Sequence, residues 1–89
     1  MSARRIGPPP ESVRALEVDG DISLYDRSSQ RALMLNGTAS AIWRLADGER
    51  TLDEVIAELA SSYHADAGAI RTDVERTVRD LVDAGFLPA

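Results

Sequence analysis

Few residues in this sequence could do catalytic chemistry, and the clearest candidate is its single histidine, His64. It stands in "SSYHADA", where no second ligand follows at a matching spacing, so it gives poor support for a metal site. The serines lie in no G-x-S-x-G pattern, and the isolated glycines form no phosphate-binding loop. We therefore expect a solvated or capping histidine, no catalytic residues, no metal site and no cofactor.

The acidic residues near the end of the chain are interleaved with arginines. Four pairs fall at i,i+4 spacing: Arg71/Glu75, Glu75/Arg79, Arg76/Asp80 and Arg79/Asp83. Such pairs usually cover a solvated helix face, and each contributes only about 0.2–0.5 kcal/mol. A carboxylate dyad for acid–base catalysis would need burial, which this spacing does not require. The pattern is therefore not that of an enzyme.

Composition narrows the class of protein further. The chain has 89 residues, enough for one domain, and a formal charge of −5 from ten basic and fifteen acidic residues. This balance argues against a general nucleic-acid binder, which needs clustered lysine and arginine. The absence of cysteine excludes disulfides and thiolate chemistry. No apolar run approaches the roughly 20 residues of a membrane span, so we expect a cytoplasmic protein without membrane contact.

Three strand-like segments are expected in the first half of the chain, at residues 13–18, 22–26 and 31–35. The polar turns "DGD" and "RSSQ" between them are short, which favours an antiparallel meander. Residues 1–11, with three consecutive prolines, are typical of a flexible and solvated tail. The folded domain is therefore expected to cover residues 12–89.

The second half of the chain predicts three helices. Asn36 or Thr38 can cap the first, "TLDE" at residues 51–54 is a capping box for the second, and Asp66 can cap the third. Glycines suited to the helix ends follow at Asp47–Gly48 and Ala84–Gly85. The apolar positions of these helices include Trp43 as a core anchor, Tyr63 at the end of a stripe, and Phe86 with Leu87 folded back. The expected class is α+β, with a three-stranded antiparallel sheet followed by three helices.

An ordered set of residues over positions 13–87 resembles the PqqD-like family of peptide-recognition domains, called RiPP recognition elements. The matching pattern is Leu35–Asn36 before a helix, Ile42–Trp43, Asp47–Gly48, Thr51 with Leu52, and the series Asp73–Val74, Leu81 and Gly85. The resemblance implies a winged-helix-like fold. It also implies that the chain captures the leader segment of a ribosomally made precursor peptide and presents it to separate processing enzymes.

The resemblance also implies a binding site and a subfamily. In this family the leader adds a strand along the third strand, over a groove bounded by the third helix. Members dedicated to pyrroloquinoline quinone synthesis usually carry Pro-Glu-Gly before the Leu–Asn pair, whereas this chain has "RALMLN". Its size looks more like the leader-binding proteins of lasso-peptide clusters, whose partners are a leader peptidase and an ATP-dependent cyclase.

The residues themselves are compatible with such a site. If the meander is ordered first, second, third, the third strand is an edge strand, and from Ala32 to Leu35 it carries neither proline nor charge to block it. The expected peptide-binding residues are Arg31, Ala32, Leu33, Met34, Leu35, Asp73, Val74, Thr77, Val78, Asp80 and Leu81. Either Asp73 or Asp80 would meet polar or basic leader groups. A helical wheel does not decide which shoulder of the third helix faces the leader.

Three other functions stay open at this point. A winged-helix DNA-binding regulator would need a basic recognition face, and the third helix mixes three arginines with at least as many acids. A chaperone for a pyrroloquinoline quinone precursor would share the fold but bind another leader. An adaptor without peptide specificity would bind processing enzymes and no isolated leader.

Overall fold

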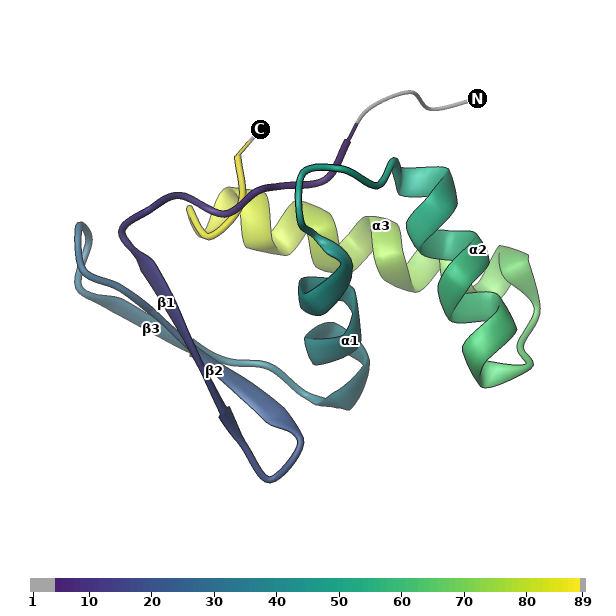
Figure 1. Cartoon of the computed structure of the whole chain (residues 1–89), viewed down its shortest axis with the longest axis horizontal. Helices are drawn as coiled ribbons and strands as arrows, with labels where there is room; N and C mark the ends of the chain where they lie inside the picture. The colour runs from purple at the N-terminus through teal and green to yellow at the C-terminus, as the bar shows by residue number, and fades with distance from the viewer. Residues whose placement is uncertain (1–4, 89) are drawn as a thin grey trace.

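The computed structural model describes residues 5–88, which form a three-stranded sheet followed by three helices (Figure 1). The elements are β1 (Val13–Val18), β2 (Asp21–Asp26), β3 (Arg31–Met34), α1 (Gly37–Leu45), α2 (Leu52–Tyr63) and α3 (Ala67–Asp83). The predicted α+β class and the order of its elements are confirmed. The winged-helix label describes this arrangement only by analogy.

The sheet is an antiparallel meander with the strand order β1-β2-β3. Asp19 and Gly20 connect β1 to β2 with φ angles of 52° and 87°, the positive values that a two-residue hairpin turn requires. In the register of the sheet, Leu24 of β2 lies between Ala15 of β1 and Leu33 of β3. Because side chains alternate between faces, Ile22 and Leu24 point together into the core.

Each helix begins at a polar cap that the sequence pattern indicates. The Asn36 side chain accepts a hydrogen bond from the Ala39 N–H at 2.9 Å, which settles the choice between Asn36 and Thr38. Thr51 and Glu54 form the predicted capping box, and Asp66 accepts from the Ala69 N–H at 3.2 Å. His64 ends α2 in a left-handed conformation. The histidine is thus a helix cap.

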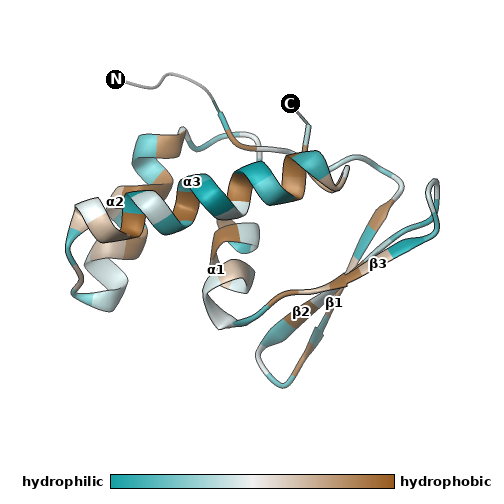
Figure 2. Ribbon diagram, turned by 180° about the vertical axis from the view of Figure 1, so that it is seen from behind, coloured by the Kyte–Doolittle hydropathy of each residue, from teal (hydrophilic) through white to brown (hydrophobic). Residues whose placement is uncertain are grey.

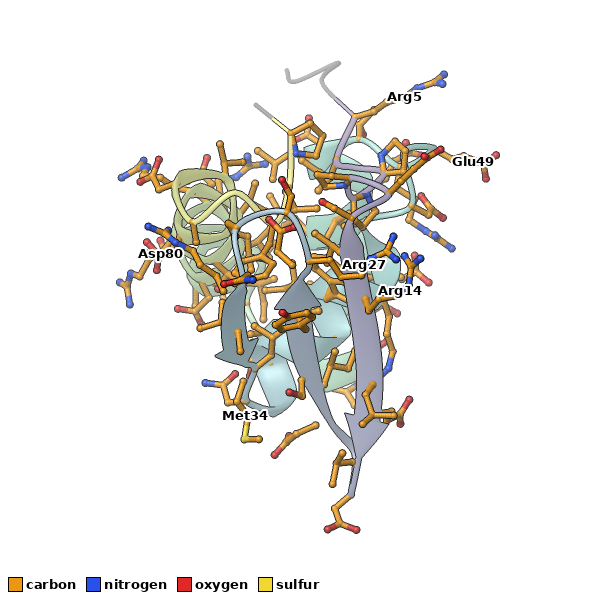
Figure 3. The ribbon with its side chains drawn as sticks, turned by 90° about the vertical axis from the view of Figure 1, so that its left-hand side faces the viewer. Arg5, Arg14, Arg27, Met34, Glu49 and Asp80 are labelled. Carbon is orange, nitrogen blue, oxygen red and sulfur yellow. The ribbon has the colours of Figure 1, made fainter. Side chains whose placement is uncertain are left out.

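The helices all lie on one side of the sheet, where α1 packs directly against β2, and the core lies between the sheet and the helices (Figures 1 and 3). Trp43 is buried within it, and Phe86 and Leu87 fold back onto it, as predicted. Tyr63 continues the apolar stripe of α2 beside Leu59 but stays half exposed at the end of the helix. The helix ends directly after Tyr63, at the His64 cap. Within residues 5–88, no helix has both the length and the apolar character needed to span a membrane.

The N-terminal segment packs more closely than the sequence predicts. Ile6 is only 3 % exposed and belongs to the core. Its N–H donates to the Arg50 carbonyl at 3.0 Å, and its carbonyl accepts from the Gly48 N–H at 2.7 Å. Residues 5–8 are therefore held against the loop between α1 and α2, and the expectation of a solvated tail is wrong for them. Within the rest of the expected tail, Pro9 and Pro10 are partly buried and Glu11 is exposed, and residues 1–4 lie outside the described residues.

Candidate binding groove

One edge of the sheet is open along β3, and a single hydrogen bond fixes which backbone groups face it. The Leu35 N–H donates to the Ile22 carbonyl at 2.8 Å. Because backbone groups alternate in direction along a strand, Arg31, Leu33 and Leu35 face β2. The N–H and C=O groups of Ala32 and Met34 point the other way, away from the sheet. No proline lies between Arg31 and Leu35 to block this edge.

A groove of about 250 Å³ runs beside this edge, between β3 and α3. Its lining comes from the strand, from the start of α1 and from one side of α3: Leu33, Met34, Leu35, Asn36, Ala39, Thr77, Asp80 and Leu81. Figure 3 shows the sheet in front, with Met34 on its left-hand strand and Asp80 on the helix beyond it. Leu35 and Leu81 are buried and form the floor, whereas Leu33 and Met34 remain accessible. An extended chain could therefore meet hydrogen-bonding groups and apolar side chains together.

The structure brings six of the eleven predicted site residues into this groove: Leu33, Met34, Leu35, Thr77, Asp80 and Leu81. Ala32 presents its backbone to the open edge just before them, and Arg31 begins the strand. Val74 lies on the same helix but is almost completely buried in the core. Asp73 is exposed and is not part of the groove lining.

Val78 lies on the opposite shoulder of α3 from Thr77. It lines a separate hollow of about 300 Å³ together with Ile6, Leu52 and Val82. The shoulder that carries Thr77 and Asp80 therefore faces β3, a choice that the helical wheel left open. Val78 is not brought together with the other predicted residues.

Two residues of the groove were not predicted. Asn36 and Ala39 line it because α1 starts immediately after β3 and turns its first residues toward α3. Leu35 and Asn36 make the short connection between β3 and α1, and this short connection is the sequence signal that could have placed Asn36 and Ala39 in the groove. Asn36 lines the groove although its side-chain oxygen already accepts the capping hydrogen bond from the Ala39 N–H.

The groove lining includes none of the carboxyls whose pKa is lowered, and the described residues place no metal-ligand cluster there. Within residues 5–88, no group of three or more His, Asp or Glu side chains lies close enough to hold a metal ion. The carboxyls with lowered pKa values include Asp26, Asp47 and Glu54, which hold turns or a helix cap and are not part of the groove lining. For Asp26, the Ser12 side chain, then the Ser28 N–H and the Ser29 hydroxyl, outweigh burial and lower the pKa.

Comparison with known protein families identifies the chain. The sequence pattern of the family described as coenzyme PQQ synthesis protein D (PqqD) matches residues 21–87. The chain belongs to the PqqD family.

Two curated relatives are called PqqA binding proteins. The one from Rhodopseudomonas palustris strain BisB5 is 41 % identical over 58 residues, which is 65 % of this chain and 57 % of the relative. The one from Bradyrhizobium diazoefficiens is 40 % identical over 58 residues, 65 % of this chain and 56 % of the relative. The match thus spans less than two thirds of these relatives.

Three solved structures share the fold. TbiB1, in complex with the TbiA(beta) leader peptide, has a TM-score of 0.84 at 19 % identity, covering 97 % of this chain and 96 % of that one. A lasso peptide synthetase B1 with its leader peptide has a TM-score of 0.82 at 21 % identity, covering 92 % and 96 %. The PqqD part of Methylobacterium extorquens PqqCD, described as a RiPP recognition element, has a TM-score of 0.75 at 24 % identity, covering 91 % and 86 %. At these identities the likeness establishes the fold.

Proposed function

We propose that this chain binds the leader segment of a ribosomally made precursor peptide by adding it as a strand to the open edge of β3. The observation that carries the proposal is the outward direction of the Ala32 and Met34 backbone groups beside an apolar groove. Main-chain hydrogen bonds to these groups would supply affinity for any extended chain. The groove side chains would supply selectivity.

The groove favours a leader with an apolar side chain next to a basic or amide-bearing one. The apolar side chain would lie over Leu33 and Leu81, and Asp80 at the rim would meet the polar neighbour. A short added strand with two or three apolar anchors is compatible with micromolar to nanomolar affinity, about −8 to −12 kcal/mol. No catalytic group is needed for this role, so the chain would act as a binding module for separate enzymes.

Two precursor classes are supported by different observations. Structural likeness over 92 % of this chain to a lasso peptide synthetase B1 in complex with its leader peptide favours a lasso-type leader. A leader peptidase and an ATP-dependent cyclase would then be the enzymes that receive it. Sequence identity to PqqA binding proteins favours a PqqA-type leader. The cytoplasm is the expected location in both cases, because precursor peptides are made there.

The test is a polarisation titration of the full chain with labelled leader peptides. One probe is the leader of the precursor encoded next to this gene, and PqqA and a lasso-type leader serve as comparisons. We expect saturable binding of the cognate leader below tens of micromolar. No binding of any leader at that concentration would rule the function out.

Two proline variants and one control test whether the leader adds as a strand to β3. Ala32→Pro and Met34→Pro each remove an outward N–H from β3, and we expect each to weaken leader binding about tenfold or more. Ala15→Pro is the control, because Ala15 is an exposed alanine whose N–H faces outward on the other edge strand, β1. This orientation follows from the hydrogen bond between the Arg27 N–H and the Ser12 carbonyl at 3.0 Å. Equal affinity for the Ala15→Pro and Ala32→Pro proteins would contradict strand addition on β3.

A further inference from the structure

The face of the sheet opposite the helices is more apolar than a solvated face should be. We call this surface the outer face; its residues are Arg14, Leu16, Val18, Asp21, Ser23, Tyr25, Ala32 and Met34. An antiparallel sheet with one side in water normally alternates apolar-in with polar-out. Here Leu16 is 66 % exposed and Met34 is 71 % exposed. No helix of the described chain covers them, and the face looks directly at the viewer in Figure 3.

The apolar side chains of the outer face adjoin one another. Leu16, Ser23 and Met34 form one cross-strand row, and Tyr25 lies in the next row between Arg14 and Ala32. Val18 is two residues from Leu16 on the same side of β1. Tyr25 and Val18 are 44 % and 47 % exposed, so four of the six large exposed apolar side chains of the described chain gather here. The hydropathy colouring shows hydrophobic and hydrophilic segments alternating along the strands (Figure 2).

Charges divide the two ends of this face. Arg14 and Arg27 lie at the end near the β2–β3 turn, as Figure 3 shows, while Met34 lies toward the other end. Asp21 lies on the face at the β1–β2 hairpin, beside Asp19 in the turn itself. Neither aspartate has a side-chain hydrogen bond or ion pair within residues 5–88. The face thus has a basic end, an apolar centre and an acidic end.

We infer that the partner of the outer face is a second copy of this chain, packed sheet against sheet in a symmetric dimer. A two-fold axis lying between the sheets and perpendicular to the strands reverses the strand direction of the second copy. It sets the basic end of each copy against the acidic end of the other, and the apolar centre against itself. Two sheets packed face to face with strands nearly aligned are a common arrangement.

This dimer leaves both β3 edges open, because it uses the faces of the sheets and not their edges. Met34 serves both surfaces: its side chain lies in the dimer face and its backbone lies at the leader edge. The dimer would therefore carry two leader sites. The inference does not depend on the proposed function, since Leu16 and Val18 lie on β1, away from the groove.

The test is sedimentation equilibrium of the full chain at concentrations up to about 0.5 mM. At that concentration, a dimer with a dissociation constant in the micromolar range would be the main species. We expect a monomer–dimer equilibrium that Leu16→Glu weakens about tenfold or more, since a charge would be buried at the centre of the face. Tyr63→Glu is the control, because Tyr63 is similarly exposed but lies at the end of α2, and it should leave association unchanged. Leader titration of the Leu16→Glu protein should give the wild-type affinity, which shows that it is folded.

Exchanging the charges of Arg14 and Asp21 tests how the two copies are oriented in the dimer. Arg14→Asp and Asp21→Arg should each weaken the dimer, because each sets like charges opposite one another, and the double exchange in one chain should restore it. A wild-type chain that stays monomeric at about 0.5 mM would overturn the inference and leave the face to another molecule or to water. A dimer that Leu16→Glu leaves unchanged would overturn it as well.

Discussion

The Leu35 N–H donates to the Ile22 carbonyl at 2.8 Å, but the Ile22 N–H does not complete the pair with Leu35. It donates instead to the Ser40 hydroxyl of α1 at 2.9 Å, and that hydroxyl donates to the Leu35 carbonyl at 3.3 Å. A side chain from the first helix thus takes the place of the last hydrogen bond between β2 and β3. The sheet and α1 are joined at the point where the groove begins.

Ser40→Ala is expected to lower the free energy of unfolding by about 1–3 kcal/mol. Ser40 is fully buried, so alanine would leave the Ile22 N–H and the Leu35 carbonyl without a partner. Urea denaturation followed by circular dichroism measures the change. Ser62→Ala, at an exposed position of α2, is the matched control. Equal unfolding midpoints for the two proteins would mean that this junction contributes no stability.

Ile6→Ala is expected to lower the free energy of unfolding by about 3 kcal/mol, because it leaves a cavity beside Val78 and Val82. The same urea experiment measures it. Arg5→Ala, at the exposed neighbouring position, should change stability by no more than about 0.5 kcal/mol. A stability loss below about 1 kcal/mol for Ile6→Ala would show that the segment is not part of the core.

The elements of the fold could be predicted because their signals are local. Asn36, Thr51 and Asp66 cap their helices through residues three positions away, and such spacing is visible in a sequence. Ile6 could not be predicted in the same way. It is one apolar residue before three prolines, with no periodicity around it, and its partners lie in the distant loop between α1 and α2.

The groove could be predicted only in part, for a similar reason. The edge strand follows from the order of a meander with short turns, and the structure confirms it. The side of α3 that meets β3 depends on how the helix is rotated against the core. Thr77 and Val78 are neighbours in the sequence and lie on opposite shoulders, and only tertiary packing assigns Thr77 to the groove and Val78 to the hollow near Ile6.

Thr77→Tyr is expected to weaken leader binding about tenfold or more, because the larger side chain would fill the groove between β3 and α3. Thr72→Tyr is the matched control, since Thr72 is exposed on the same helix and is not part of the groove lining. Polarisation titrations of both proteins give the comparison. If Thr77→Tyr bound the leader as tightly as Thr72→Tyr, the leader would not occupy this groove.

Asp26→Asn is expected to lower stability at neutral pH, and the difference from wild type should shrink in acid. Hydrogen bonds from the Ser12 side chain, the Ser28 N–H and the Ser29 hydroxyl lower the pKa of Asp26 in the fold. A lowered pKa gives stability that is complete above the ordinary aspartate range and is lost as the pH falls below about 4. Urea midpoints of both proteins at neutral and acid pH test this. A difference that is the same at both pH values would contradict it.

The most direct measurement of the central claim is amide hydrogen exchange in β3, with and without a saturating leader peptide, followed by NMR. In the free chain we expect fast exchange at Ala32 and Met34, which face the open edge, and slow exchange at Leu33 and Leu35, which face β2. Bound leader should slow exchange at Ala32 and Met34 about tenfold or more, because it supplies their missing acceptors. If a bound leader left both amides exchanging as fast as in the free chain, strand addition to this edge would be contradicted.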